Sequence, residues 1–408
     1  MGLIALAAGC DSDSSASIVA PVPTTTPIRK EDGVLTIGLM IPQDSANADI
    51  GAAIRSSVSL AKRMIDSAGG VDNQPIRVIP VDEGVAGLGV DPAVTVLLDD
   101  DVDAIVGPAS SIDALASLGE IVDAGVVACS PTASSALLDN FPDDGLFFRT
   151  IPSDSLQAVA IADAVNNTGA TQATVVYIDD DYGQVFNESV VAALRDEGIE
   201  PTVSVRYSPD NVSISAAAEH VAAMGSSVVV VIGDAVSGQV MLAAIDGAES
   251  TVRPRFVVND AMRRPTTSAE PMGVDLANRI IGISPLAYST NADFLADLGA
   301  TPDNPSPYAA NAFDCVNLIA LAALASGRTQ PAAIAAQIPA ISSSGSPCMT
   351  FAQCRDDLIL DRNINYDGPG GRLTIGVNGD LTEADFEVFG FDETGRDIRL
   401  TTRSATAP

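Results

Sequence analysis

The sequence predicts an α/β protein with two doubly wound lobes, each built on a parallel sheet that helices cover on both faces. Three observations indicate this fold class. Short apolar runs alternate with segments of helical spacing from residue 34 onward. The runs consist almost entirely of Val, Ile, Leu and Ala, as in strands that are buried on both faces. The alternation restarts after residue 152, and 408 residues leave room for two or three domains.

The first lobe begins with the apolar strand VLTIGLMIP at residues 34–42. A helical segment follows at 47–70 and ends in two glycines, which are a common helix C-terminal signal. Three more β-rich runs follow, at residues 75–83, 103–108 and 125–131. Helical stretches at residues 91–99 and 111–124 separate them. Parallel strands need such crossovers, so these elements predict one parallel sheet.

The second lobe repeats the arrangement, with strands predicted at residues 172–183, 200–208, 226–234 and 253–260. A further strand at 279–287 and a long apolar helix at 305–327 follow, and the Gly-rich end of the chain is typical of hairpins. We expect the chain to cross between the lobes near residues 150, 284 and 385. One lobe would then hold residues 34–149 plus 284–384, and the other 150–283 plus 385–402.

The N-terminal residues are typical of the end of a bacterial lipoprotein signal. A short apolar run precedes Ala-Gly-Cys, and small polar residues follow. We expect residues 1–9 to be part of a signal and Cys10 to carry lipid. Residues 10–33 are rich in Ser, Thr and Pro and predict a disordered tether. This organisation predicts a location outside the cytoplasm, anchored to a membrane.

The charge balance limits the possible partners. The formal net charge is −32, and the sequence has only two lysines, Lys30 and Lys62. Such a surface repels nucleic-acid phosphates and anionic lipid headgroups, so we expect no nucleic-acid partner. It suits solubility in a salty or extracytoplasmic medium. We also expect that no segment of the chain is apolar enough, over enough residues, to span a bilayer.

The cysteines and the single histidine predict disulfide chemistry and no metal site. Cys348 and Cys354 are six residues apart, and in an exported protein this spacing suggests a small disulfide loop. Cys129 falls in a predicted strand and Cys315 in the apolar helix, so we expect both to be buried thiols. His220 lies on a helical pattern without a cysteine cluster around it, which disfavours a metal centre.

The signatures of common enzyme classes are missing. The sequence contains no P-loop, no dinucleotide fingerprint and no Gly-x-Ser-x-Gly elbow, and a Ser-His-Asp triad would have to use the mid-helix His220. A cofactor-dependent enzyme on this α/β framework is therefore the disfavoured alternative. We expect a protein that is not an enzyme and that uses no cofactor.

Hydroxyl-bearing loops follow two neighbouring strands of the first lobe. Ser110 and Ser111 come after the third strand, and Thr132 and Ser134 come after the fourth. Hydroxyls together with the free N–H groups of helix N-termini suit a small anion such as a carboxylate. The alternative is ordinary helix capping, in which case Ser111 would do no more than cap its helix.

The second lobe offers acids at the ends of its strands. Tyr182 follows a run of three aspartates, and Asp234 and Asp260 each follow an apolar strand. Acids that face a hydroxyl-lined loop would suit a zwitterion, with its carboxylate on one lobe and its ammonium on the other. The alternative is a set of solvated acids on a very acidic protein.

These stretches together resemble the extracytoplasmic solute-binding proteins of branched-chain amino acid ABC transporters, which have the type I periplasmic-binding fold. The resemblance covers about residues 34–399. Its more specific segments are AGGVDNQPIRVIPVDE, DAIVGPASS, VVACSPTAS, VVYIDDDYGQ and YDGPGGRLTIGVNGD. The resemblance implies a three-stranded hinge, closure of the lobes over an amino acid, and delivery of that ligand by a monomeric receptor to a membrane permease.

The resemblance also implies roles for single residues. Ser111, the backbone of Thr132, and the N–H and hydroxyl of Ser134 would hold the ligand's carboxylate. Asp260 would hold its ammonium and Tyr182 would close over it. Ala109 and Ser110 would line the pocket for the ligand's side chain, and Tyr308 would form an aromatic wall. The resemblance also supports a disulfide between Cys348 and Cys354.

Two positions depart from the family pattern and leave the ligand open. Asp234 stands where a second tyrosine often lies, and Ile50 stands where an aromatic residue often covers the ligand's side chain. An extra acid is compatible with a branched-chain or a more polar amino acid, and also with an amide or another small polar solute. A sensory module that signals on closure, without transport, is the alternative function.

Overall fold

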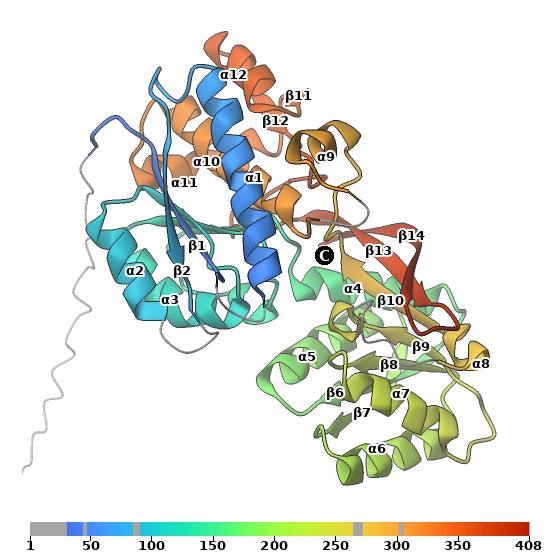
Figure 1. Cartoon of the computed structure of the whole chain (residues 1–408). Coiled ribbons are helices and arrows are strands. Elements are labelled where there is room, and N and C mark those ends of the chain that lie inside the picture. Colours follow the sequence, from blue (N-terminus) through green and yellow to red (C-terminus); the bar gives the residue numbers. More distant parts are fainter. Residues whose placement is uncertain (1–30, 44–46, 85–89, 264–271, 302–305, 408) are drawn as a thin grey trace, which may run out of the picture.

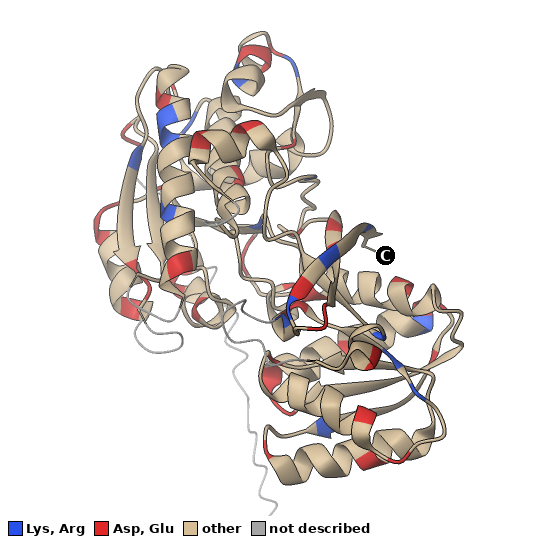
Figure 2. Cartoon of the chain, turned by 45° about the vertical axis from the view of Figure 1, so that its right-hand side comes forward, with Lys and Arg blue, Asp and Glu red and all other residues tan. Residues whose placement is uncertain are grey.

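The computed structural model describes residues 31–43, 47–84, 90–263, 272–301 and 306–407. Two α/β lobes lie side by side and are joined by several crossing segments (Figure 1). Acidic residues are distributed over both lobes, whereas Lys and Arg are sparse (Figure 2). The predicted fold class, two doubly wound lobes joined by a three-stranded hinge, is therefore correct.

The first lobe is built on a five-stranded sheet in the order β2-β1-β3-β4-β5, in which every neighbouring pair is parallel. Its central strands are apolar and completely buried, as their sequences predict. These strands are β1 (Thr36–Ile41), β2 (Arg77–Asp82), β3 (Ala104–Val106), β4 (Val127–Ser130) and β5 (Phe147–Arg149).

Helices cover both faces of this sheet. Two of them, α2 (Val90–Asp99) and α3 (Ser111–Asp123), pack against each other, while α1 (Ala48–Ser67) packs against α10 (Ala309–Ser326), which in turn contacts α11 (Pro331–Ile341). The lobe is completed by α9 (Ala292–Leu298), α12 (Phe351–Ile359), the turn η1 (Ala136–Leu138) and a small parallel pair, β11 (Ser346–Cys348) and β12 (Ile364–Tyr366).

The second lobe is built on a seven-stranded sheet in the order β14-β13-β10-β9-β8-β6-β7. The five strands from β10 to β7 are parallel, but β13 is antiparallel to both β10 and β14. The expectation of a wholly parallel sheet is therefore wrong at one edge. The strands are β6 (Gln172–Ile178), β7 (Glu200–Tyr207), β8 (Val228–Ile232), β9 (Arg255–Val258), β10 (Ile280–Pro285), β13 (Glu383–Phe391) and β14 (Asp397–Thr406).

The hairpin of β13 and β14 comes from the end of the chain and completes a sheet whose other strands lie far earlier in the sequence. The predicted hairpin character of this segment is confirmed. The helices of the second lobe are α4 (Asp154–Asn166), α5 (Asp181–Asp196), α6 (Asn211–Met224), α7 (Ser237–Gly247), α8 (Val274–Ala277) and the turn η2 (Asp260–Met262).

The three crossing segments lie between β5 and α4, between β10 and α9, and before β13. Hydrogen bonds fix the first crossing to the first lobe. Thr150 Oγ1 donates to the backbone oxygen of Asn311 at 2.9 Å, and Asn311 Nδ2 donates to the backbone oxygen of Thr150 at 2.7 Å. The assignment of residues to the two lobes, with boundaries at 150, 284 and 385, stays a prediction.

Helix α10 corrects one expectation from the sequence. Its 18 residues have a mean hydropathy of 1.5, which meets the length and composition criteria for a membrane span, so the expectation that no segment does so is wrong. In the structure, however, 83% of this helix is buried. It packs between α1, α11 and the strands β3 and β4. Its apolar composition is therefore that of an interior helix of the lobe.

Both pairs of buried cysteines form disulfides. Cys348 and Cys354 are bonded, with Cα atoms 5.3 Å apart, as predicted. Cys129 of β4 and Cys315 of α10 are also bonded, with a Cα separation of 5.7 Å, so the expectation of two free buried thiols is wrong. The sequence could not show this pairing because 186 positions separate the two cysteines and only the packing of α10 on β4 brings them together.

Candidate functional site

The two hydroxyl-bearing loops lie side by side, because β3 and β4 are neighbours in the sheet. Thr132 Oγ1 donates to the backbone oxygen of Ala109 at 2.6 Å, and Ser111 Oγ accepts from the backbone N–H of Ser135 at 3.3 Å. Each loop is therefore hydrogen-bonded to the other. The structure brings Ala109, Ser111, Thr132 and Ser134 together, as the sequence predicts.

The two adjacent serines differ in their hydrogen bonds. Ser110 is the N-cap of α3, and its hydroxyl accepts from the backbone N–H groups of Ile112 and Asp113 at 3.2 and 3.3 Å. Ser111 is the first helical residue, and its hydroxyl oxygen accepts from Ser135. The hydroxyl proton of Ser111 therefore remains available to a ligand, while the proton of Thr132 is already donated to Ala109.

A buried arginine supports the second loop from below. Arg149 is fully buried, and its Nη1 donates to the backbone oxygen of Ser135 at 3.0 Å. Its charge is balanced by Asp139, at 2.6 Å, and by Asp380, to which Nε donates at 2.7 Å. Because its donors hold the loop's carbonyl oxygens, Arg149 fixes the backbone on which Thr132 and Ser134 stand. The sequence analysis did not identify it.

A buried acid supports the first loop. Glu83 follows β2, is 2% exposed, and its Oε2 accepts from the backbone N–H of Ala109 at 2.8 Å. The pKa of Glu83 is raised to about 7, mainly by burial and also by the charge of Asp113, against the lowering effect of the hydrogen bond from Ala109. The position of the Ala109 backbone thus depends on a carboxyl group that changes charge near neutral pH.

The acids at the site belong to two different elements. Asp260 begins η2 after β9, as predicted, and its neighbour is Asp154, the first residue of α4. Asp154 is 2% exposed; burial, and then the charge of Asp260, raise its pKa well above its ordinary value. The Asp154 N–H donates to the backbone oxygen of Ser134 at 2.8 Å, and the nearby Ser134 side chain lowers the pKa of Asp154, against the larger effect of burial.

Asp154 thus connects the hydroxyl-bearing loop to the acids of the second lobe. The sequence analysis missed Asp154, since acids are common in the first turn of a helix, where they interact favourably with the helix dipole. The available signal was its position directly after β5, where the chain crosses between the lobes. Burial also raises the pKa of Asp260. Two desolvated carboxyl groups in close proximity create a strong preference for a cationic group.

Amide side chains orient the acid and the tyrosine. Gln157 is completely buried, and its Nε2 donates to Asp260 Oδ1 at 2.9 Å and to the backbone oxygen of Ile283 at 2.7 Å. Asn259, also completely buried, donates from Nδ2 to the hydroxyl oxygen of Tyr182 at 3.0 Å. Neither amide appears among the sequence predictions, because neither carries a charge or follows a recognisable motif.

Both predicted tyrosines lie near the acids. Burial raises the pKa of Tyr182, and the charges of Asp154 and Asp260 raise it further. Burial likewise raises the pKa of Tyr308, followed by the charge of Asp260. Tyr308 has a φ of 57° at the start of α10, and its N–H donates to the backbone oxygen of Ala287 at 2.6 Å. The structure therefore groups Tyr182 and Tyr308 around Asp260.

Asp234 has mainly local contacts. Its carboxylate accepts from the N–H groups of Val236 and Ser237, both at 2.6 Å, and from the Ser237 hydroxyl at 2.7 Å. These bonds lower its pKa despite partial burial. They satisfy the first turn of α7. Whether Asp234 also contacts a ligand stays a prediction.

Two other predictions concern lipid and metal. Cys10 lies outside the described residues. Within the part of the chain that the structure describes, no group of three or more His, Cys, Asp or Glu side chains is arranged to hold a metal ion. The single histidine, His220, is exposed on α6.

Comparisons with known proteins agree with this architecture. The family model described as periplasmic binding protein matches residues 34–364. The chemotactic signal transduction system substrate-binding protein BasB of Halobacterium salinarum is 26% identical over 357 residues, which cover 84% of this chain and 83% of BasB. The amino acid binding protein of Pseudomonas aeruginosa is 22% identical, over 89% of this chain and 91% of its own length.

Solved structures share the fold at low sequence identity. An ABC transporter substrate-binding protein from Desulfitobacterium hafniense in complex with Leu has a TM-score of 0.66 and 20% identity, over 90% of this chain and 99% of its own. A second structure is LivJ from Streptococcus pneumoniae, a branched-chain amino acid transporter substrate-binding protein in complex with isoleucine. It has a TM-score of 0.63 and 18% identity, and the match covers 91% of this chain and 99% of LivJ. The chain described here belongs to the periplasmic binding protein family.

Proposed function

We propose that this protein is an extracytoplasmic receptor that captures a small amino acid by lobe closure and delivers it to the permease of an ABC transporter. The observation that carries the proposal is that Asp154 lies next to both Ser134 and Asp260: its N–H donates to the backbone oxygen of Ser134, and the charge of Asp260 raises its pKa. This proximity places a hydroxyl-bearing and N–H-bearing loop next to two desolvated acids. A zwitterion satisfies both, with its carboxylate at the Ser111 and Ser134 loops and its ammonium at Asp154 and Asp260.

The charges around the site support a ligand that carries an ammonium group. The two nearest arginines are each already paired with two acids: Arg149 with Asp139 and Asp380, and Arg263 with Glu387 and Asp397 at 2.7 and 3.0 Å. Neither has spare positive charge for Asp154 or Asp260. Removing a buried acid pair from water without a cation is costly, so a ligand that supplies one gains affinity.

The resemblance and the family suggest the wider setting. We propose that Cys10 carries a lipid anchor, that residues 10–33 act as a tether, and that the receptor works as a monomer outside the cytoplasm. Ala109, Ser110 and Tyr308 would surround the ligand's side chain, and Tyr182 would cover the ligand after closure. No catalytic step or cofactor is part of the proposal.

A sensory role is the second candidate. It is favoured by BasB of Halobacterium salinarum, which is named as part of a chemotactic signal transduction system. Both roles use the same closure on the same class of ligand. Uptake of a labelled amino acid and movement along a gradient of that amino acid, each measured with and without this receptor, separate transport from sensing.

The ligand class is tested by thermal unfolding of the purified protein with single amino acids, amides and small carboxylates. At a hundredfold excess over Kd, a ligand stabilises the folded protein by about 2.7 kcal/mol. We expect at least one amino acid to raise the melting temperature by a few degrees, and its des-amino carboxylate to have no effect. Benzoate, which is bound by a solute-binding protein of the same fold from R. palustris, serves as a carboxylate without an ammonium group. Stabilisation by carboxylates alone would contradict the role of the acids.

A further inference from the structure

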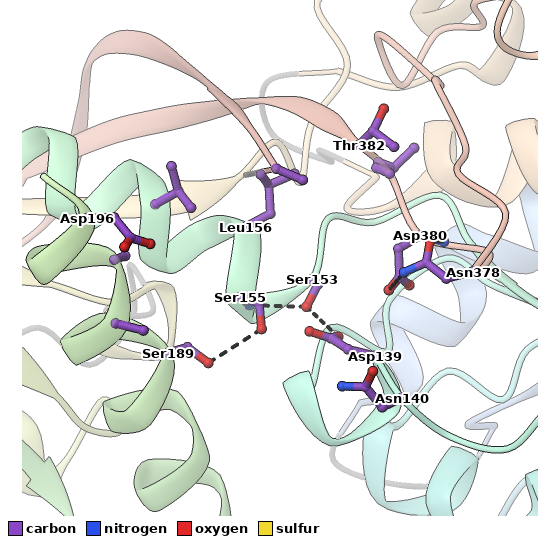
Figure 3. Close-up of a pocket in the computed structure, with 15 residues that line it drawn as sticks. Asp139, Asn140, Ser153, Ser155, Leu156, Ser189, Asp196, Asn378, Asp380 and Thr382 are labelled. Carbon is purple, nitrogen blue, oxygen red and sulfur yellow. Dashed lines mark hydrogen bonds between the residues drawn. The ribbon is translucent and has the colours of Figure 1, made fainter.

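A cavity lies at the junction of the two lobes, and its lining includes Asp139 and Asp380, the two acids that pair with Arg149. Its volume is about 370 Å³. Asp139, Asp380 and Thr382 line it from one side, next to η1 and the third crossing segment, while α4 and α5 line it from the other (Figure 3). It therefore has walls from both lobes.

The cavity and the candidate amino-acid site use opposite faces of α4. Ser155 and Val159, one helical turn apart, line the cavity. Asp154 and Gln157 belong to the other face, where they contact Ser134 and Asp260. On α5, residues 189, 192, 193 and 196 form a single face towards the cavity, whereas Tyr182 lies at the far N-terminal end of that helix. The two sites are thus separated by a helix.

The lining of the cavity is acidic at its two ends and apolar between them. Figure 3 shows Asp196 at one end, Asp139 and Asp380 at the other, and Leu156 between the two groups. The apolar centre is completed by Val159, Ala193 and Leu381. Hydroxyl groups border it, with Ser155 Oγ 3.4 Å from Ser189 Oγ and Ser153 Oγ donating to Asp139 Oδ1 at 2.6 Å.

At each end, the described acids outnumber the cations that are paired with them. Asp139 and Asp380 share a single cation, since both pair with the buried Arg149. At the other end stands Asp196, which is exposed. Among the described residues that line the cavity there is neither a lysine nor an arginine. The arrangement is complementary to a molecule with one positive charge at each end and methylene groups in the middle.

We propose that this junction cavity is a second ligand site, which takes a short linear aliphatic diamine in its doubly protonated form. One ammonium group would lie near Asp196 and the other near Asp139 and Ser153. The methylene chain would pack on Leu156 and Val159. Because the walls come from both lobes, the bound diamine contacts both of them at once.

The probe is 1,4-diaminobutane, titrated calorimetrically into the whole protein at pH 7 in 150 mM salt. The comparison compounds are 1,4-butanediol, which has the same length without charge, and n-butylamine, which has one charge. We expect binding in the order diamine, monoamine, diol, with no detectable binding of the diol. Equal binding of the diamine and the monoamine would overturn the two-ended site, and so would the absence of any diamine binding.

Three variants locate the bound probe. Asp196→Asn removes one charged end at an exposed position, so folding is unaffected, and diamine affinity should fall roughly threefold to fivefold towards that of the monoamine. Asp123→Asn removes an exposed acid of α3, outside the cavity, and should leave the affinity unchanged. Equal losses in both variants would mean non-specific attraction to an acidic protein and would overturn the proposal.

Asp260→Asn separates this site from the candidate amino-acid site. It should leave diamine binding unchanged, because Asp260 does not line the junction cavity. Loss of diamine binding in Asp260→Asn together with retention in Asp196→Asn would place the diamine at the other acids and overturn the proposal. A thermal melt of each variant without ligand checks that all three are folded.

Discussion

At the scale of single residues, the candidate site depends on which hydrogen-bond donors and charged groups already have a partner within the protein. The hydroxyl proton of Thr132 is donated to Ala109, and the backbone oxygen of Ser134 accepts from the N–H of Asp154. In the proposed function, the N–H of Ser134 and the hydroxyl of Ser111 would be the donors to a ligand carboxylate. The acids Asp154 and Asp260 remain as acceptors for an ammonium group. Residue identity alone does not reveal this division, because each hydroxyl has one proton and several possible acceptors.

Replacing Asp260 by Asn tests the ammonium role. The change keeps the shape of the side chain and an oxygen that accepts from Gln157, but it removes the negative charge. We expect the binding free energy of the amino acid found in the thermal screen to become less favourable by about 2 kcal/mol or more, since a desolvated charge partner is lost. Isothermal titration provides the measurement. Asp181→Asn, at an exposed acid at the start of α5, is the matched control. An unchanged Kd in Asp260→Asn would reject the role.

Glu83 predicts a pH dependence of stability. Its pKa is about 7 in the folded protein and 4.5 in the reference state, so the unfolded chain releases this proton first as pH rises. The contribution of Glu83 to the free energy of unfolding therefore decreases between about pH 4.5 and 7, by on the order of 3 kcal/mol. Glu83→Gln retains an oxygen acceptor for Ala109 and should flatten this decrease.

Urea unfolding at pH 5 and pH 8 measures the effect. The stability difference between the two pH values should be smaller in Glu83→Gln than in the unchanged protein. Glu120→Gln, an exposed acid of α3, should show the unchanged difference. If both variants behave alike, the titration of Glu83 is not linked to folding.

At the scale of elements, the cross-links and hydrogen bonds concentrate where the first lobe meets the hinge. Helix α10 carries Cys315, which is bonded to Cys129 of β4, the strand that leads into the Thr132 loop. The same helix carries Asn311, which exchanges two hydrogen bonds with Thr150 of the first crossing. The helix therefore connects the Thr132 loop and the first crossing segment to the core of the lobe.

The two disulfides should differ in their effect on stability. The chain-entropy model gives about 5 kcal/mol for the Cys129–Cys315 bond, which closes a loop with a sequence separation of 186, and about 2 kcal/mol for Cys348–Cys354, with a separation of 6. Double Cys→Ala variants of each pair, compared by chemical denaturation, measure both values. Losses of equal size, or a larger loss for the short loop, would contradict this assignment.

At the scale of the whole molecule, the proposed function depends on the relative position of the two lobes. The hydroxyl-bearing loops belong to the first sheet, whereas Tyr182 and Asp260 follow strands of the second. Rotation about the three crossing segments changes the separation of these groups without repacking either sheet, which is the usual form of hinge closure. A ligand shifts this equilibrium only as far as it binds the closed form more tightly.

Closure is measurable by small-angle X-ray scattering. We expect the radius of gyration to fall when the amino acid identified by the thermal screen is added at saturating concentration. Asp260→Asn at the same ligand concentration should keep the larger radius, since the contact that holds the second lobe on the ligand is weakened. An unchanged radius in the original protein, with ligand shown to be bound, would argue against closure.

The sequence predicted the fold where local patterns suffice. Apolar strands, helical spacing and glycine signals located β1 to β4, β6 to β10, α1 to α3 and α10, because these features reflect burial and backbone geometry that neighbouring residues encode. Ser111, Thr132 and Asp260 were identified from their positions after strands. Helices α11 and α12 and the β11–β12 pair had no counterpart among the predictions, and the antiparallel β13 was assigned only as part of a hairpin.

By itself, the sequence determined the two-lobed α/β class, the hydroxyl loops, the acidic strand ends and the short-range disulfide, all of which depend on residues close together in the chain. Only the tertiary structure decided that Asp154 lies near both Ser134 and Asp260, that Arg149 binds the backbone of the Thr132 loop, and that Cys129 pairs with Cys315. The physical reason is that these contacts join residues on different elements. Their proximity is set by how helices and sheets pack together, and the periodicity of a single segment carries no information about that packing.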